Sequence, residues 1–345
     1  MGDIGGRKTE HLDIVLNRDV SAQGVTTGLE RVRFAHVALP EIALADVTLS
    51  TRFLGCELRA PLLVSSMTGG TAQAARINEA IARASEATGI AFAVGSQRVA
   101  LDEGGVAGFD RGLRRLAPSV PILANFGAAQ LKTWDGPDMA LRAVDMIGAD
   151  ALIVHLNPLQ EAVQSGGDTD WSGLLVAIGR IARAVPFPVV VKEVGAGISG
   201  ATARRLVDEG VSVIDVAGAG GTSWAAVEAE RAPTARLRAV GLAFRDWGIP
   251  TADAVRDVRR ACPEVTLVAS GGLRDGIDCA KAIRIGADMT GIAAGVLAAA
   301  LDGADALVAR LAGVVDELRI ACFCTGSRTL ADLRAAPLVE RSGAP

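Results

Sequence analysis

The 345-residue sequence contains no tyrosine, and aromatic residues make up only 3% of it. Positive charge is not in excess either, because the formal net charge is −4. Proteins that bind nucleic acid present a basic surface and usually aromatic side chains on which bases stack. We therefore expect no nucleic-acid partner.

Long apolar runs and paired cysteines are also missing. The longest uncharged apolar stretch, 291–301, is much shorter than the roughly 20 residues that cross a membrane. The chain starts with MGDIGGRKTEHLD, which is charged where a secretory signal is apolar. The five cysteines have no CxxC spacing, which excludes a disulfide framework and a zinc site of the usual kind. We expect a cytoplasmic protein without a membrane partner, in which the cysteines are small buried side chains.

Short apolar runs recur along the chain and are bounded by Pro, Gly, Asp or Asn, as buried parallel strands are. They cover 61–67, 91–97, 121–127, 151–157, 188–194, 211–217, 266–272 and 289–295. Segments with helical spacing lie between most of them, for example 74–89 and 173–185. An open doubly wound sheet would carry GxGxxG after its first strand, but the sequence there is SSMTGGT. The pattern predicts an α/β fold, a (β/α)8 TIM barrel with an N-terminal extension.

The chain divides into three parts on this interpretation. Residues 1–60 form the extension, and its polar–apolar alternation from 47 to 58 predicts a hairpin that closes the barrel bottom. Residues 61–335 form the barrel, and 336–345 are a C-terminal tail. The long connection 218–265, rich in Gly and Ala at its start, is expected to be a mobile active-site loop.

Polar residues gather at the carboxyl ends of the predicted strands, where barrel enzymes place their active sites. Lys192 lies in an apolar strand, so an anion is expected beside it, either a ligand or its neighbour Glu193. Glu161 cannot hold zinc alone but suits Mg²⁺, which keeps several waters. His155 is either a site residue or a hydrogen-bonded core residue. The other candidates at these ends are Met67, Thr68, Gly69, Ser96, Gln97, Arg98, Asn125, Asn157, Gln160 and Thr222.

Glycine replaces polar side chains after the last two strands, at Gly271 and Gly272 and at Ala294 and Gly295. Bare backbone N–H groups and a following helix N-terminus bind phosphate well at this place in a barrel. An ordinary tight turn is the alternative for each pair alone. The presence of both turns on adjacent strands favours a phosphate site.

The motifs together resemble the type 2 isopentenyl-diphosphate δ-isomerases, which are FMN-dependent (β/α)8 barrels. The matching segments span nearly the whole chain in the family's order. They are RKTEHLDI (7–14), ALPEI (39–43), SSMTGGT (65–71), GSQR (95–98), NFGAAQL (125–131), HLNPLQE (155–161), VKEVGAG (191–197), DVAGAGGTSW (215–224), WGIPTADA (247–254), SGGLRDG (270–276) and TGS (325–327). The resemblance implies reversible conversion of isopentenyl diphosphate to dimethylallyl diphosphate with FMN, Mg²⁺ and NADPH as reductant, in a homo-oligomer of four or eight chains.

The resemblance also implies roles for individual residues. Glu161 is expected to bind Mg²⁺, and Gln160, His155 and Asn157 are expected to be catalytic. The expected substrate contacts are Arg7, Lys8, Ser96, Gln97, Arg98 and Gln160, together with His155 and Asn157. The expected FMN contacts are Met67, Thr68, Gly69, Ser96, Asn125, Lys192 and Thr222, with Gly271, Gly272, Ala294 and Gly295 around its phosphate.

Two other functions remain open from the sequence. An FMN-dependent 2-hydroxy-acid oxidase or dehydrogenase shares the barrel and the lysine, but such enzymes usually use a Tyr and a late His, and this chain has no His after His155. A flavin-binding protein without turnover would keep Lys192 but has no need of Arg7, Lys8, Arg98 or Glu161.

Overall fold

The eight predicted strands are all present in the computed structural model, which describes residues 4–67, 72–103 and 108–339. They form a closed parallel barrel in the order β10-β3-β4-β5-β6-β7-β8-β9, so the predicted (β/α)8 architecture is confirmed. The strands are β3 (Leu62–Val64), β4 (Ala91–Ala93), β5 (Ile122–Gly127), β6 (Ala151–Leu156), β7 (Val189–Glu193), β8 (Val213–Asp215), β9 (Thr266–Ala269) and β10 (Met289–Ile292).

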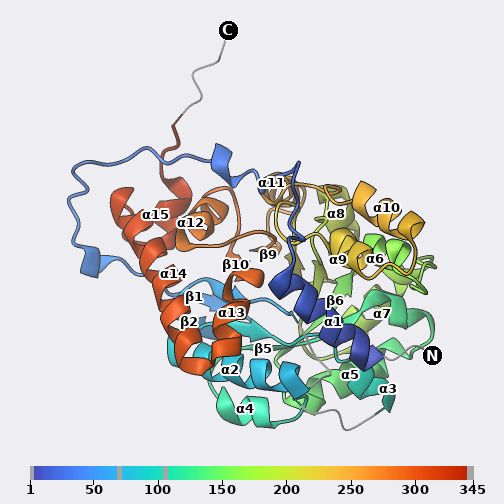
Figure 1. Cartoon of the computed structure of the whole chain (residues 1–345). Coiled ribbons are helices and arrows are strands. Elements are labelled where there is room, and N and C mark those ends of the chain that lie inside the picture. Colours follow the sequence, from blue (N-terminus) through green and yellow to red (C-terminus); the bar gives the residue numbers. More distant parts are fainter. Residues whose placement is uncertain (1–3, 68–71, 104–107, 340–345) are drawn as a thin grey trace.

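Helices cover the outside of the barrel and bury one apolar face each (Figure 1). In α5 the buried Ala140, Ala143 and Ile147 recur at the spacing of one helix face. The covering helices are α2 (Ala72–Thr88), α3 (Arg98–Glu103), α4 (Gly112–Leu116), α5 (Gly136–Ile147), α7 (Leu174–Ala184), α8 (Gly200–Asp208), α11 (Thr251–Ala261), α12 (Gly276–Arg284), α14 (Ala304–Cys324) and α15 (Leu330–Ala335), with a 3-10 turn η3 (Ala128–Lys132).

The connection 218–265 is not the loop that the sequence suggested. It contains α9 (Trp224–Glu230) and α10 (Ala235–Ala243) before the covering helix α11. Ser223 and Thr234 each cap the following helix through the side-chain oxygen. Two more short helices follow strand ends, α6 (Pro158–Val163) after β6 and α13 (Ala294–Asp302) after β10.

The amino-terminal end of the barrel is closed by an antiparallel hairpin of β1 (Thr51–Phe53) and β2 (Cys56–Leu58). Its two-residue turn, Leu54-Gly55, has positive φ at both positions, which matches the twist of the strands. Phe53 and Leu58 are buried in one apolar cluster with inward-facing strand residues such as Leu123 and Ile153. This end of the barrel is therefore an apolar floor.

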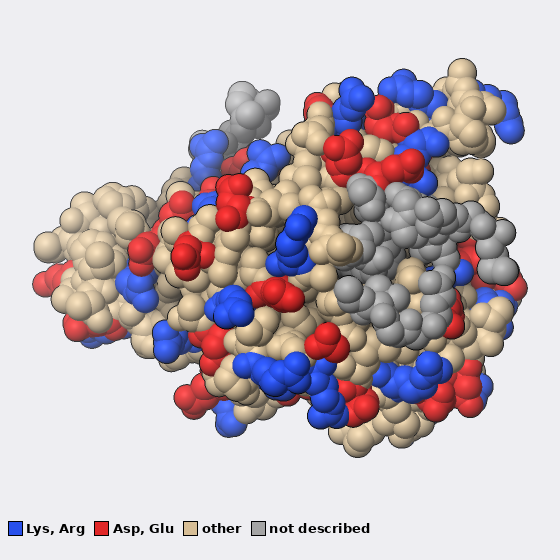
Figure 2. Space-filling view, turned by 60° about the horizontal axis from the view of Figure 1, so that its bottom comes forward, with Lys and Arg blue, Asp and Glu red and all other residues tan. Residues whose placement is uncertain are grey.

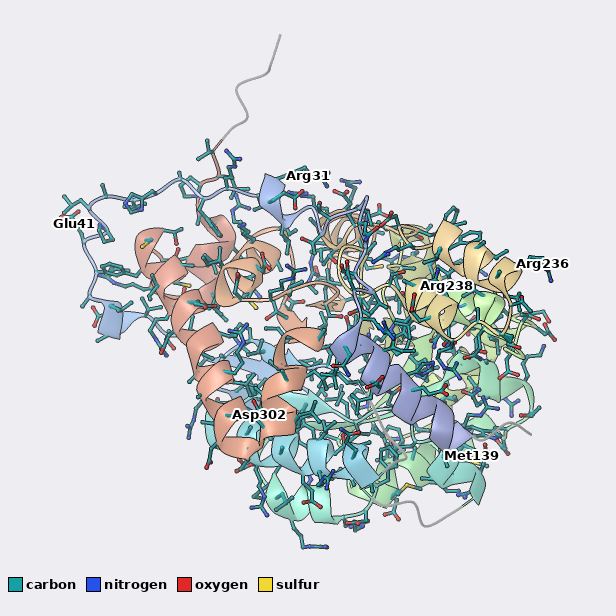
Figure 3. All side chains as sticks on the ribbon, in the orientation of Figure 1. Arg31, Glu41, Met139, Arg236, Arg238 and Asp302 are labelled. Carbon is teal, nitrogen blue, oxygen red and sulfur yellow. The ribbon has the colours of Figure 1, made fainter. Side chains whose placement is uncertain are left out.

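The N-terminal extension wraps around the barrel to its other end. Helix α1 (Ile4–Asn17) packs against α9 and α13 and crosses the carboxyl ends of the strands (Figure 1). Ser21 then pairs with Thr222 and Phe34 with Leu338, so the extension reaches from the barrel mouth to the C-terminal segment. It includes the 3-10 turns η1 (Leu29–Arg31) and η2 (Leu44–Asp46). Figure 3 shows Glu41 at its outer edge, on the opposite flank from Arg236 and Arg238 of α10.

The surface carries both signs of charge. On the face shown in Figure 2, Lys and Arg are interspersed with Asp and Glu. Among the helices that the structure describes, none has the length and apolar character that crossing a bilayer requires.

Candidate functional site

A cavity of about 690 Å³ opens at the carboxyl ends of the strands, on the side opposite the apolar floor. Residues of the loops after the strands line it, and His11, Leu12 and Val15 of α1 cover it. The sequence-predicted residues that line it are Met67, Ser96, Arg98, Asn125, His155, Asn157, Gln160, Glu161, Lys192, Thr222, Gly271, Gly272, Ala294 and Gly295. Its volume lies in the range of sites that bind small molecules and cofactors.

Three groups of predicted residues do not appear in this lining. Thr68 and Gly69 lie outside the described residues. Arg7 and Lys8 belong to α1, in which the described side chains start at Glu10. Gln97 is fully buried away from the cavity.

Gln97 joins the strand wall to the helix behind it. Its Nε2 donates to the carbonyl of Ala143 in α5 at 2.9 Å, and its Oε1 accepts from the N–H of Asn125 at 2.9 Å. Because both ends of the amide are bonded within the protein, the structure assigns Gln97 to the wall. Gln97 was expected to contact the substrate, but the structure does not place its side chain in the cavity lining.

His155 and Asn125 hold each other on neighbouring strands β6 and β5. Asn125 Nδ2 donates to the carbonyl of Val94 at 3.1 Å, which leaves its Oδ1 as the acceptor facing His155 Nδ1 at 2.9 Å. His155 Nδ1 is therefore the donor of this pair. The hydrogen bond fixes the orientation of the ring, which lines the cavity.

An amide and carboxylate network follows β6. Pro158 opens α6, and the short helix brings Asn157, Gln160 and Glu161 onto one side. Asn157 Nδ2 donates to Gln160 Oε1 at 3.2 Å and to Glu161 Oε1 at 3.0 Å. Glu161 Oε2 accepts from Gln164 Nε2 at 3.0 Å and from the N–H of Asp168 at 2.8 Å. The buried Asn157 Oδ1 finds no hydrogen-bond partner among the described residues, so this network has unused acceptor capacity beside the cavity.

Glu228 of α9 extends this network and was not expected from the sequence. Its Oε1 accepts from Gln160 Nε2 at 2.9 Å and lies 2.9 Å from His11 Nε2, while Arg231 Nη1 donates to its Oε2. Burial acts to raise the pKa of Glu228, but the hydrogen bonds from His11 and Gln160 and the charge of Arg231 lower it by more, so the carboxylate stays ionised. Helix α1 is thus docked on the same carboxylate that orients Gln160.

Lys192 is buried near two buried carboxyl groups. Its Nζ donates to the carbonyl of Glu193 at 2.6 Å, and its strand register pairs it with Asp215. Burial raises the pKa of both Glu193 and Asp215, although the charge of Lys192 acts in the opposite direction. Asp215 Oδ1 accepts from Ser270 at 2.6 Å, while its Oδ2 has no hydrogen-bond partner in the described structure.

The Glu193 side chain does not face Lys192 as an ion-pair partner. Its Oε2 accepts from four successive backbone N–H groups, those of Val194 to Gly197. The carboxylate thus shapes the turn after β7, because it satisfies N–H groups that the turn would otherwise leave unpaired.

The two glycine turns lie on the other side of the cavity. Gly271 and Gly272 have φ of 97° and 76°, which favours glycine. A Cβ on Gly271 would lie 2.2 Å from the carbonyl oxygen of Gly218, so main-chain atoms would have to move. On the adjacent strand, Ala294 starts α13 beside Gly295. Backbone of these turns therefore forms much of this wall, at the positions of the glycine pairs in the sequence.

Arginines supply most of the positive charge around the cavity. Arg98 Nη1 lies 3.3 Å from Asp168 Oδ2, so this cation already has an acidic neighbour. Arg18, Arg274 and Arg310 also line the cavity and were not singled out in the sequence. Arg274 follows the glycine pair within the SGGLRDG segment, whereas Arg18 and Arg310 come from distant segments that only packing brings here.

The described residues contain no group of three or more His, Cys, Asp or Glu side chains placed to hold a metal ion. Glu161 therefore stands as a single carboxylate. Each of its oxygens has two lone-pair positions, and the three hydrogen bonds it accepts leave room for one further ligand.

The chain is similar to a known family, to named relatives and to solved structures. Residues 156–340 match the family model described as FMN-dependent dehydrogenase. The chain is 59% identical to an isopentenyl-diphosphate delta-isomerase of Stutzerimonas stutzeri over 97% of each chain, and 48% identical to one of Nostoc sp. over 97% of this chain and 95% of that one. A mandelate oxidase variant with a monooxide FMN adduct superposes with a TM-score of 0.67 at 18% identity over 95% of each chain, which is a likeness of fold.

Proposed function

Because the chain belongs to the isopentenyl-diphosphate delta-isomerase family, we propose that it converts isopentenyl diphosphate reversibly to dimethylallyl diphosphate with FMN. One observation carries this proposal. A glycine-lined wall suited to a phosphate and a hydrogen-bonded wall suited to proton transfer face each other in a single cavity beside Lys192.

The residues present fit FMN. The cavity volume of about 690 Å³ accommodates a flavin and a small substrate, and the positive-φ turn at Gly271 and Gly272 lets backbone approach a phosphate closely. Met67, Ser96, Asn125 and Thr222 line the same cavity as that turn and Lys192. When bound and reduced, FMN supplies an acid and base at a ring nitrogen.

Lys192 supplies the positive charge for this cofactor. An ammonium group buried in a strand costs free energy unless it faces an anion, and the Lys192 ammonium donates a hydrogen bond to the neutral carbonyl of Glu193. We propose that it stabilises the anionic form of the reduced ring.

The proton transfer would depend on three side chains, those of Gln160, His155 and Asn157. The Gln160 amide is oriented at both ends, since Glu228 accepts from its Nε2 and Asn157 donates to its Oε1. A fixed amide can orient the proton that is added to or removed from the substrate carbon. His155, with its orientation set by Asn125, would contact the substrate through Nε2.

The diphosphate would be neutralised by cations and Mg²⁺. Arg98 lines the cavity, and Arg7 and Lys8 belong to the helix that covers it. Glu161 is our proposed Mg²⁺ ligand, because a magnesium ion that keeps its waters needs only one or two carboxylates plus substrate phosphates. Ser96 would contact both the substrate and FMN.

The 2-hydroxy-acid oxidase alternative is less well supported. The sequence has no Tyr, and the other two histidines, His11 and His36, precede His155. The solved oxidases share the fold at 16–19% identity, whereas the isomerases are 47–59% identical. A non-catalytic flavoprotein would not need the oriented Gln160.

An anaerobic assay with isopentenyl diphosphate, FMN, Mg²⁺ and a catalytic amount of NADPH tests the proposed function. We expect many molecules of dimethylallyl diphosphate for each NADPH consumed, and deuterium in the product formed in D₂O. Consumption of one NADPH per product would instead identify a net redox reaction and revive the oxidase alternative.

We further propose that the protein works in the cytoplasm as a homo-oligomer of four or eight chains. Exposed apolar side chains at Leu39, Leu44 and Ile320 are candidates for contacts between copies. Analytical ultracentrifugation that finds only monomers at micromolar concentration would reject this part.

A further inference from the structure

Arg310 connects the two glycine turns, although it belongs to neither of them. Its Nε donates to the carbonyl of Gly295 at 3.3 Å, and its Nη2 donates to the carbonyl of Arg274. Gly295 follows β10, and Arg274 follows the glycine pair after β9. One guanidinium therefore bridges the loops of two neighbouring strands at the edge of the cavity.

The fold explains how a residue of α14 reaches this place. Gly303, with φ of 123°, joins α13 to α14 in a helical hairpin, so the chain returns along α13. Residues about equally far from the turn lie side by side, which sets Arg310 beside the start of α13. The buried Leu307 and Leu311 fix the rotation of α14 around its axis.

The charge of Arg310 has no acidic counterpart in the described part of the chain. No carboxylate pairs with Arg310 there, whereas Arg98 in the same cavity faces Asp168 and the charge of Arg274 acts on Asp278. The two hydrogen bonds of Arg310 go to neutral carbonyls and leave three of the five guanidinium donors for other partners. An arginine in this state is well suited to an anion in the cavity, and the planar guanidinium matches the geometry of a phosphate group.

We propose that Arg310 is a phosphate-binding residue that selects the phosphorylated flavin over its dephosphorylated form, riboflavin. The side chain acts in two ways: its charge attracts the phosphate, and its bridge holds the two glycine turns at the right separation. This inference rests on the proposed function, because it assumes that the turns receive the phosphate of FMN.

The dissociation constants of FMN and riboflavin, measured by quenching of flavin fluorescence, test this role without any assay of turnover. Arg310→Met should weaken FMN binding about 10- to 100-fold, the range for a hydrogen bond between charged groups, and change riboflavin binding less than about twofold. Arg310→Lys keeps the charge but cannot bridge both carbonyls, so it should lie between Met and the parent protein.

Arg319→Met is the matched control. Arg319 lies on the same helix but pairs with Asp316 on an exposed face, so its loss should change neither constant. An equal loss of FMN and riboflavin affinity in Arg310→Met would show a purely structural role and overturn the proposal. Unchanged affinity for both flavins would also overturn it. If the parent protein binds no FMN, the proposed function fails as well. If the parent protein binds FMN but Arg310→Met keeps the parent's ratio of FMN to riboflavin affinity, only the Arg310 inference is rejected.

Discussion

The two walls of the cavity differ in the groups that they offer a ligand. At the ends of β9 and β10 the wall is mainly backbone, formed by the turns at Gly271 and Gly295 with the Arg310 side chain beside them, and we call it the backbone wall. At the ends of β5 and β6 the wall consists of side chains that orient one another, from Asn125 to Glu161, and we call it the side-chain wall. Backbone N–H groups do not titrate, whereas the side-chain wall contains an imidazole and a carboxylate, which can bind and release protons, and amides that orient them.

This difference suggests how the work is divided. The backbone wall suits a group that must only be held, such as a phosphate. The side-chain wall suits a group that reacts, because its polar atoms are fixed before the ligand arrives. Each wall should therefore fail in its own way when it is altered.

The largest expected effect is on the side-chain wall. Gln160→Leu removes the oriented amide at similar volume, so kcat should fall by about 10²–10⁴-fold, the usual range for acid–base effects. FMN affinity should change little. Steady-state kinetics at saturating FMN measure the first quantity and fluorescence titration the second. A kcat equal to that of the parent protein in this variant would show that Gln160 takes no part in the reaction.

Glu161→Gln is the contrasting variant from the same helix. It keeps the shape but removes the negative charge that we assign to Mg²⁺, so higher Mg²⁺ should restore part of its activity. Gln160→Leu should show no such rescue. An identical Mg²⁺ response in both variants would contradict the division between metal binding and proton transfer.

The next effect is on the backbone wall. Gly271→Ala places a Cβ within 2.4 Å of two main-chain atoms of Gly218 and strains a residue with φ of 97°. Strain of this kind costs on the order of 1–3 kcal/mol, so FMN affinity should fall about 10- to 100-fold. Gly313→Ala is the control, since nothing lies within 4 Å of its Cβ in α14. Equal FMN affinity in the two variants would argue against a phosphate at this turn.

The smallest effect concerns the helix that covers both walls. The folded-state pKa of Glu228 lies below its ordinary value of 4.5. Its contribution to docking α1 is therefore complete above pH 4.5 and is lost as the pH falls through the folded-state pKa. Glu228→Gln keeps the shape but not the charge, so KM for isopentenyl diphosphate should rise about three- to tenfold at neutral pH.

Limited proteolysis of the N-terminal segment gives a second readout for this variant. Cleavage in the parent protein should increase only in acid, whereas Glu228→Gln should be cleaved faster at neutral pH and change less on acidification. Parental KM and parental cleavage in the variant would show that Glu228 does not anchor α1.

The sequence predicts the two walls unequally. Apolar runs placed all eight strands, and the glycine pairs revealed the backbone wall, because these signals are local. The role expected for Gln97 rests on the resemblance, and no local signal in the sequence shows that its amide bonds to Ala143 of α5 and to Asn125. Glu228 and Arg310 gave no signal, since their neighbours His11 and Gly295 meet them only when helices dock.

The most direct test of the divided cavity compares FMN with riboflavin in the unaltered protein, measuring the dissociation constant and the kcat at saturation for each flavin. Riboflavin leaves the backbone wall without its phosphate but reaches the side-chain wall intact. We expect at least about tenfold weaker binding, the lower limit for losing charge-assisted hydrogen bonds, and a kcat close to that with FMN. Equal affinity for the two flavins would contradict the account.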